Sequence, residues 1–370
     1  MRNLGTIGVA AVVGAALLLA APHAAAKNGV IGAVYTMTND AAGNAVLQYD
    51  RFANGSLQYR ASYDTEGQGS GGGLGNQGGV VLSDNGRWLL VVNAGSDNVS
   101  VFAVQGRGLR LTDTQWSGGT SPISVAIYRD LVYVVHAGSD NVAALRLGRN
   151  GQLTQLPGSS RNLSAVGAMP AQIGFSPDGR FVAVTEKATN IIAVFPIAAD
   201  GYAGSGVFNA SEGQTPFAFG FGKRDQLFVS EVFGGAPDAG AVSSYRLLGD
   251  GTLETIDASV PNHQTAPCWL VVSKGGRFAF TTNTPDDSLS AYRIGFNGQV
   301  SLVDPDGRTG EPGAGTSPLD MDLSDDGRHL YTLNIGNGTI STFRVGPHGS
   351  LTETSTVSGV PAGVNGLAAE

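Results

Sequence analysis

The side chains best suited to acid–base chemistry lie at the C-terminal end of a segment that recurs along this sequence. Six polar residues occupy the equivalent last position of that segment: Asn93, His136, Glu186, Glu231, Asn283 and Asn334. In the closest pair of copies, VNAGSDNV (92–99) and VHAGSDNV (135–142), histidine replaces asparagine. A carboxylate or a neutral imidazole can take a proton from water, whereas asparagine commonly shapes a loop. Glu186 and His136 are therefore candidate general bases, with a purely structural role as the alternative.

Other catalytic patterns are nearly absent. The sequence contains no Gly-x-Ser-x-Gly elbow, no His-Glu-x-x-His, no Cys-x-x-Cys pair and no complete Ca²⁺ loop. Gly67, Gly69 and Gly72 match Gly-x-Gly-x-x-Gly. Because that segment joins two expected strands and precedes no helix, dinucleotide binding is excluded. The single cysteine, Cys268, cannot form an intrachain disulfide and is expected to be a buried thiol.

The elements that must position the candidates are strands of a repeated unit. Four clear copies are VVLSDNGRWLLVVN (80–93), IGFSPDGRFVAVTE (173–186), LVVSKGGRFAFTTN (270–283) and MDLSDDGRHLYTLN (321–334). With two weaker copies, their anchor residues recur every 45 to 51 residues: Ser83, Tyr128, Ser176, Gly222, Ser273 and Ser324. This spacing is typical of propeller blades and not of helical repeats. Period-two apolar alternation between turn residues predicts antiparallel hairpins, with four strands per copy.

The predicted fold is an all-β, seven-bladed β-propeller of four-stranded antiparallel blades, forming one domain over residues 27–370. Six copies account for residues 77 to about 359. The N-terminal part supplies three strands of another blade, and VPAGVNGL (360–367) resembles the start of an innermost strand. We therefore expect the C-terminal strand to complete the first blade, which closes the ring and removes its free sheet edges.

Residues 1–26 have the pattern of a signal peptide. Arg2 precedes an apolar run, and Ala24-Ala25-Ala26 fits a cleavage site. A membrane anchor is the alternative, but export to the periplasm or the medium is favoured, without membrane insertion after signal removal. The formal net charge of −8 provides no basic surface for nucleic acid. We expect a monomer that acts on a small molecule.

The innermost strands predict a second set of site residues. In a propeller the first strand of each blade lines the central channel, and alternation directs Gln172, Trp269 and Asp320 toward it. Trp269 offers an apolar wall or plugs the channel, and Asp320 offers a carboxylate. Together with the six strand ends, these residues are expected to surround one cup on a single face. The glycine-rich segment 67–79 is expected to be a flexible cover over it.

The repeats and the segment SPDGRFVAVTE (176–186) resemble the seven-bladed propeller lactonases, the family of 6-phosphogluconolactonase and carboxymuconate cyclase. The resemblance covers essentially all of the chain after residue 26, and it implies lactonase-like chemistry. Glu186 matches the glutamate that ends the family's SPDGR…NE stretch. The family's Arg-His pair falls on Ala171 and Gln172 in this chain.

The charges of the expected cup favour a neutral substrate. Phosphorylated or tricarboxylate substrates need cationic partners. The cup is expected to hold one lysine, Lys187, beside five carboxylates: Glu186, Glu231, Asp286, Asp287 and Asp320. The preferred prediction is therefore ring opening or closing of a neutral lactone. Glu186 or His136 would be the base, Gln172 and Asn283 would hold the carbonyl oxygen, and Trp269 would pack the ring.

Two further functions remain open. One is a non-catalytic propeller that binds a ligand or protein through the same face. The other is a Ca²⁺-dependent lactone hydrolase, because carboxylates and amides supply the oxygen ligands that Ca²⁺ prefers. Its candidate ligands are Glu186, Glu231, Asn283, Asn334 and Asp320. No other cofactor is expected.

Overall fold

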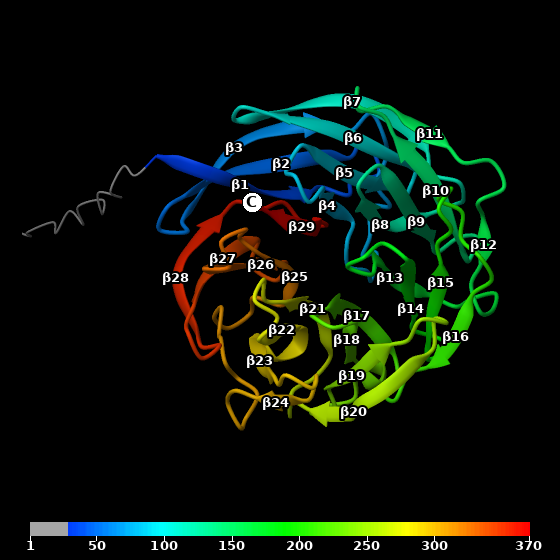
Figure 1. Cartoon of the computed structure of the whole chain (residues 1–370). Coiled ribbons are helices and arrows are strands. Elements are labelled where there is room, and N and C mark those ends of the chain that lie inside the picture. Colours follow the sequence, from blue (N-terminus) through cyan, green and yellow to red (C-terminus); the bar gives the residue numbers. More distant parts are fainter. Residues whose placement is uncertain (1–28) are drawn as a thin grey trace, which may run out of the picture.

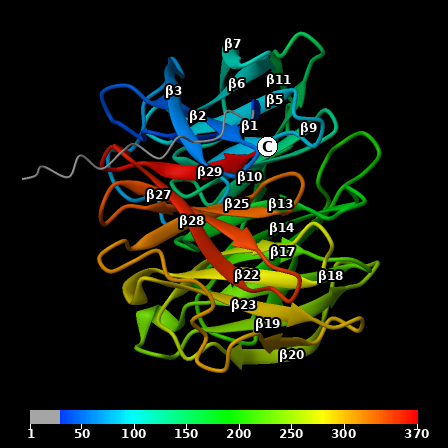
Figure 2. The same cartoon turned by 90° about the vertical axis from the view of Figure 1, so that its left-hand side faces the viewer.

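Segments with alternating apolar residues form antiparallel strands, and these strands make seven blades around a central channel (Figures 1 and 2). The computed structural model describes residues 29–370, so the predicted signal segment lies outside the described residues. Within each blade the strands run from an innermost strand A to an outermost strand D. This confirms the predicted fold class. Within the described range, no helix is both long and apolar enough to cross a membrane.

The strands of each blade follow in order from the channel outward. Blade 1 contains β29 (Asn365–Ala369), β1 (Val30–Met37), β2 (Ala45–Phe52) and β3 (Leu57–Asp64). Blade 2 contains β4 (Val80–Leu82), β5 (Trp88–Asn93), β6 (Asn98–Gln105) and β7 (Gly108–Trp116). Blade 3 contains β8 (Pro122–Tyr128), β9 (Leu131–His136), β10 (Asn141–Leu147), β11 (Leu153–Gln155) and β12 (Arg161–Asn162). Blade 4 contains β13 (Pro170–Phe175), β14 (Phe181–Glu186), β15 (Ile191–Pro196) and β16 (Val207–Ala210).

The remaining blades have the same order. Blade 5 contains β17 (Pro216–Phe221), β18 (Gln226–Glu231), β19 (Ala241–Leu247) and β20 (Leu253–Pro261). Blade 6 contains β21 (Pro267–Val272), β22 (Phe278–Asn283), β23 (Ser288–Ile294) and β24 (Val300–Leu302). Blade 7 contains β25 (Pro318–Leu323), β26 (His329–Asn334), β27 (Thr339–Val345) and β28 (Leu351–Ser358). Two 3₁₀ turns, η1 (Phe233–Gly235) and η2 (Thr284–Asp286), lie in the connections between strands B and C of blades 5 and 6.

The C-terminal strand closes the ring, as predicted. β29 pairs antiparallel with β1, placing Ala369 opposite Val34 and Ala368 opposite Tyr35. Figure 1 shows the C-terminus beside β1 at the closure point. The strand begins at Asn365, five residues later than the sequence comparison suggested. Blade 1 thereby joins the two ends of the described chain.

Blade 3 departs from the predicted four strands because its outer strand is broken. β11 and β12 both pair with β10, at different points along it. Pro157 and Gly158 form a turn between them. Proline has no amide to donate to a strand ladder, so the outer strand stops before it and resumes afterwards.

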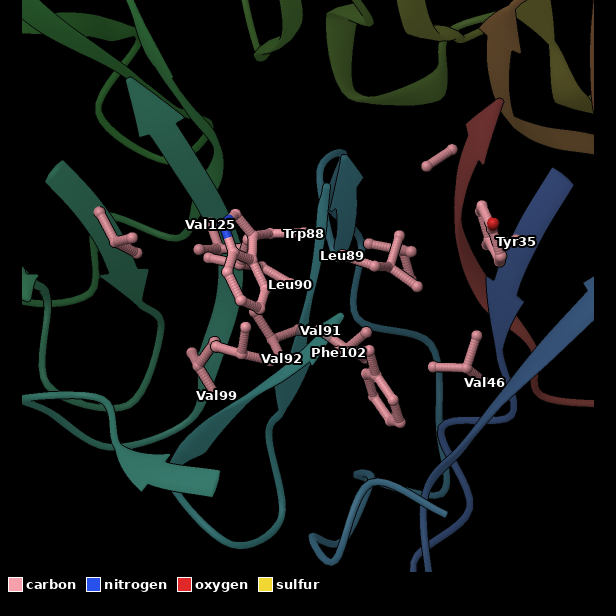
Figure 3. Close-up of a cluster of buried hydrophobic side chains, with 14 of the residues drawn as sticks. Tyr35, Val46, Trp88, Leu89, Leu90, Val91, Val92, Val99, Phe102 and Val125 are labelled. Atoms are coloured by element: carbon pink, nitrogen blue, oxygen red, sulfur yellow. The ribbon is translucent and has the colours of Figure 1, made fainter. Parts of the chain in front are cut away.

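The core lies between neighbouring blades. Figure 3 shows successive residues of β5 pointing to opposite sides, with Leu89 toward Tyr35 and Val46 of blade 1 and Leu90 toward Val125 of blade 3. All of these residues are buried. Because both faces of an inner blade strand pack against other blades, strands such as WLLVVN are apolar throughout.

The repeated Ser-x-x-Gly-Arg turns stabilise the A–B hairpins. In four blades the serine hydroxyl accepts the amide five residues later, at 3.0 to 3.1 Å. These serines are Ser83, Ser176, Ser273 and Ser324. The A–B and C–D turns share one face, here called the bottom, and the D–A and B–C connections share the opposite face, here called the top. The repeated turns are therefore structural, and the predicted strand ends face the top.

Candidate functional site

The six strand-B ends lie at equivalent positions but do not line an open cup. Each is the last residue of its strand, and each has 0% exposure: Asn93, His136, Glu186, Glu231, Asn283 and Asn334. The prediction that they surround a solvent-filled mouth is therefore wrong. Instead, most of them bind the top-face connection that enters their own blade, inside separate buried networks.

The asparagines show the common scheme. Asn93 donates to Ser100 at 2.8 Å and accepts from Thr65 of the preceding D–A connection at 2.8 Å. The Asn283 amide donates to Ser290 at 2.9 Å and accepts from Asn262 at 2.8 Å. Asn283 therefore has no free group to hold a substrate carbonyl, as had been expected of it. The Asn334 amide likewise donates to a serine seven residues later, at 2.9 Å.

Glu186 and His136 are held in different blades by different partners. Glu186 accepts from the amide of Ser164 at 3.0 Å, from the Ser164 hydroxyl, and from Thr189 at 2.8 Å. His136 Nδ1 lies 3.2 Å from the Asn141 oxygen, and Nε2 lies 2.9 Å from Ser117 Oγ. Burial lowers the pKa of His136 to about 4. The structure gives these two predicted bases no shared partner.

Glu231 is the most extensively bound of the six. Its carboxylate accepts from the amide of Gly213 at 2.8 Å, from the hydroxyl of Ser243 at 2.5 Å and from the hydroxyl of Ser259 at 2.6 Å. Burial raises its pKa, and these hydrogen bonds oppose the rise. The network joins the connection that enters blade 5 to strands β19 and β20 of that blade, which gives Glu231 a structural role.

The glycine-rich segment 67–79 crosses the channel and is fastened there, unlike the flexible cover that was expected. Residues 76–78, here called the plug, reach the innermost strands of three blades. The Gly78 carbonyl oxygen accepts from the backbone amide of Val125 at 2.9 Å. The backbone amide of Gln77 donates to the Ala171 carbonyl oxygen at 3.1 Å. The Gln77 side chain pairs with Leu270 of blade 6. Since these strands lie on different sides of the channel, the plug divides it into two spaces.

Trp269 and Lys187 also hold this segment. Trp269 is 4% exposed, and its Nε1 donates to the Asn76 oxygen at 2.8 Å. The Lys187 ammonium donates to the Gly75 oxygen. Burial lowers the pKa of Lys187 to about 8. Trp269 thus anchors the plug, and its other side borders an apolar hollow above it.

Below the plug, a cavity of about 320 Å³ opens toward the bottom face. This lower chamber has Gln77 and Gly78 above it and Gln172 in its wall. Its ionisable lining consists of Asp84, Asp320, Asp322, Asp325, Glu370 and Lys274. The structure therefore brings together two predicted site residues, Gln172 and Asp320, but below the plug and not in a top-face cup.

The inner edges of the blades use many channel side chains as hydrogen-bond partners. Five backbone amides of the inner strands donate hydrogen bonds to groups in the channel: Val125 to Gly78, Ile173 to Ser124, Phe219 to Gln172, Leu270 to Gln77 and Met321 to Asp320. Gln172 also donates to the Phe219 oxygen at 3.1 Å. Because a buried backbone amide without a partner is costly, these contacts stabilise the channel wall. The Gln172 amide is therefore occupied and does not hold a substrate carbonyl.

Asp320 and Asp322 point from the same face of β25 into the lower chamber. Asp320 is 2% exposed, and burial raises its pKa well above the ordinary value. Asp322 accepts from the amides of Leu323 at 2.8 Å and Ala369 at 3.0 Å. Burial raises the pKa of Asp322 to about 6, against the effect of these hydrogen bonds. Above about pH 6 the Asp322 carboxyl is therefore ionised, whereas burial favours the protonated form of Asp320.

The predicted Ca²⁺ ligands do not form one cation site. Glu186, Glu231, Asn283 and Asn334 belong to four different blades, and Asp320 lies in the lower chamber. Across residues 29–370, no three His, Cys, Asp or Glu side chains are grouped as metal ligands. The donor set named from the sequence therefore does not fit a shared Ca²⁺ ion.

Sequence and structure comparisons agree on the fold. A family model described as "Lactonase, 7-bladed beta-propeller" matches residues 33–166 and 223–358. No curated protein matches the chain. A crystal structure of a candidate 6-phosphogluconolactonase from Bacteroides uniformis ATCC 8492 superposes with a TM-score of 0.73 at 17% identity, covering 90% of this chain and 99% of that one.

Two further structures have the same architecture. A candidate 6-phosphogluconolactonase from Bacteroides fragilis NCTC 9343 gives a TM-score of 0.68 at 17% identity, covering 93% of this chain and 99% of that one. The Pseudomonas aeruginosa periplasmic gluconolactonase PpgL gives 0.66 at 18% identity, covering 90% and 98%. At these identities the likeness establishes the fold alone.

Proposed function

Because the chain belongs to the seven-bladed β-propeller lactonase family, we propose that it opens or closes the ring of a neutral lactone in its lower chamber. The observation that carries the proposal is the pair Asp320 and Asp322, which share one strand face beside one cavity. Burial raises the pKa of both carboxyl groups. Two neighbouring carboxyls in different protonation states can act as acid and base.

The proposed hydrolysis uses Asp322 as general base and Asp320 as general acid. The Asp322 carboxylate takes a proton from a water molecule while the water oxygen attacks the lactone carbonyl carbon. The ring C–O bond then breaks, and the ring oxygen leaves with the proton of the Asp320 carboxylic acid. The product is a hydroxy acid. Proton return from Asp322 to Asp320 through chamber water restores both groups, and the reverse sequence closes the ring.

The charge of the chamber supports an uncharged substrate. Five of its six ionisable side chains are acidic, and the lysine, Lys274, lies 3.5 Å from Asp325. A phosphorylated or carboxylated lactone would meet repulsion there without a free cationic partner. A volume of about 320 Å³ is within the range of small-molecule sites.

Glu186 and His136 remain alternative catalytic residues. Because both are fully buried, a reaction at either one would require the top-face connections around it to open. A Glu186→Gln variant tests this directly. If Glu186→Gln abolishes lactone turnover in folded protein while Asp322→Asn does not, the catalytic centre is at the top and the chamber proposal fails.

Two functions of other classes remain alternatives. A non-catalytic propeller would bind a ligand or a protein without turnover. A Ca²⁺-dependent hydrolase would lose activity in chelator and regain it with Ca²⁺. We also propose a periplasmic or secreted location, supported by the signal-like residues 1–26 and by the description of one structural neighbour as periplasmic. Cell fractionation and N-terminal sequencing test this, with Lys27 expected as the first residue.

The decisive experiment is a screen of neutral lactones, with glucono-δ-lactone and δ-valerolactone as first substrates, in buffer with Ca²⁺ and with chelator. Turnover that is lost in Asp322→Asn supports the proposal. An Asp84→Asn variant at the chamber rim serves as a matched control. Absence of turnover above background over the whole panel would reject the enzymatic function.

A further inference from the structure

A second cavity lies on the top side of the plug. This upper hollow, about 360 Å³ in volume, has six apolar side chains in its lining: Leu74, Trp269, Leu319, Ile335, Ala362 and Val364. No charged side chain lines it. Ile335 at its edge is 43% exposed, which is unusual for a large apolar side chain in this protein. Such a concave apolar surface gains free energy when an apolar molecule removes it from water.

One polar side chain in the lining is free to bind. Asn365 is 4% exposed, and its side-chain oxygen is buried without a hydrogen-bond partner among residues 29–370. A buried amide without partners is destabilising, whereas a partner supplied by a ligand satisfies it. Trp269 cannot play this role, because its Nε1 already donates to Asn76. The indole therefore contributes apolar surface.

The roof of the hollow is backbone of the glycine-rich segment 67–79. Gly72, Gly73 and Gly75 contribute backbone to the lining, and a side chain added at Gly72 or Gly73 would meet no atom within 4 Å. The segment is nevertheless fixed at one end, because Asn39 Nδ2 donates to the Gly72 oxygen at 2.7 Å. At the other end Lys187 binds Gly75. Between these two fixed points only Leu74 carries a side chain, so most of the roof is backbone that a bound molecule can approach closely.

We propose that the upper hollow is a binding site for a small uncharged molecule with an aromatic or alicyclic body and one hydrogen-bonding group directed at Asn365. The apolar lining selects the body, and the absence of charged lining disfavours an ion, which would lose its hydration without a counter-charge. The plug separates this site from the lower chamber. The proposal therefore does not depend on lactone chemistry.

Binding of p-cresol, p-xylene and p-toluate to the purified protein tests the proposal. The first two have nearly the same shape and differ in one hydroxyl, and the third carries a carboxylate. We expect p-cresol to bind about tenfold more tightly than p-xylene, the value of one satisfied hydrogen bond. We expect no measurable binding of p-toluate. Titration calorimetry and saturation-transfer NMR measure all three.

Variants locate the site. Leu319→Trp fills the hollow and should abolish binding of both uncharged probes, and Ile335→Arg at the rim serves if Leu319→Trp does not fold. Asn365→Val should reduce p-cresol affinity to that of p-xylene. Val166→Ser, which removes an exposed apolar side chain elsewhere, should leave affinity unchanged. Binding that survives both filling variants, tighter binding of p-toluate, or equal affinity for p-cresol and p-xylene would overturn the proposal.

Discussion

The side-chain amide of Gln77 pairs with both backbone groups of Leu270, although the two residues lie 193 positions apart, and both hydrogen bonds are 3.0 Å long. Gln172 makes the same pair with Phe219, the equivalent residue of blade 5. A glutamine amide thus replaces the missing strand on the inner edge of a blade. Through Gln77, the connection between blades 1 and 2 is tied to blade 6.

Gln77→Leu should destabilise the protein by about 1–3 kcal/mol for each backbone group that it leaves unpaired. The substitution retains volume but removes both hydrogen bonds to Leu270. Urea unfolding followed by circular dichroism measures the change. The control is Gln58→Leu on an exposed outer strand, which should change stability by less than about 0.5 kcal/mol. Equal effects of the two variants would show that the plug contact contributes nothing.

Catalysis by the carboxyl pair predicts a pH profile with one ascending limb. The Asp322 carboxylate is the active form, and its pKa is raised to about 6. kcat/KM should therefore rise about tenfold per pH unit below that value, and it should fall again at higher pH where Asp320 loses its proton. Asp322→Asn should reduce kcat/KM by about 10² to 10⁴ and remove the limb. A limb that persists in Asp322→Asn would assign the titration to another group.

His136→Asn should make folding less sensitive to acid. The pKa of His136 is lowered to about 4 in the fold from an ordinary 6.5, so the unfolded chain binds the additional proton between these values. Native stability is full above pH 6.5 and falls toward pH 4, by at most about 1.4 kcal/mol per pH unit from this residue. Asparagine is the residue that blade 2 uses at this position, Asn93.

The measurement for His136→Asn is urea unfolding at several pH values between 4 and 7. The control is His348→Asn, which replaces an exposed histidine in a C–D turn. The difference in stability between wild type and His136→Asn should shrink as the pH falls through this window. A constant difference at every pH would contradict the assignment.

Deletion of residues 361–370 should prevent stable folding. It removes β29, whose five residues are all buried, and it exposes the edge of β1 to solvent. Such an edge promotes aggregation. Soluble yield, size-exclusion chromatography and thermal unfolding measure the outcome. A synthetic peptide with the deleted residues should restore part of the soluble fraction, and a truncated protein with unchanged melting would refute the closure argument.

The repeated pattern predicted the strands well because each copy carries its own local signals. Period-two alternation between turn residues predicted the antiparallel hairpins that β13, β14 and β15 form. The same alternation directed Gln172 and Asp320 into the channel. The C-terminal strand was also assigned correctly to the first blade, because the incomplete blade required a partner strand.

The position of the site was not predictable in the same way. A strand end such as Glu186 is visible in the sequence, but whether it meets solvent depends on the incoming connection, here Ser164. No local pattern connects Gln77 with Leu270, so the crossing of the channel by segment 67–79 has no sequence signal. The contact of Asp322 with Ala369 depends on ring closure, which no local pattern in β25 encodes.

The pairing of β29 with β1 has a consequence for biosynthesis. The innermost strand of the first blade leaves the ribosome after all the strands of blades 2 to 7. Blades 2 to 7 can assemble as synthesis proceeds, but the ring stays open until β29 is released. During that interval the inner edge of β1 has unpaired backbone groups that are exposed to other chains. Protection of this edge by a chaperone would then decide how much of the newly made protein is recovered intact.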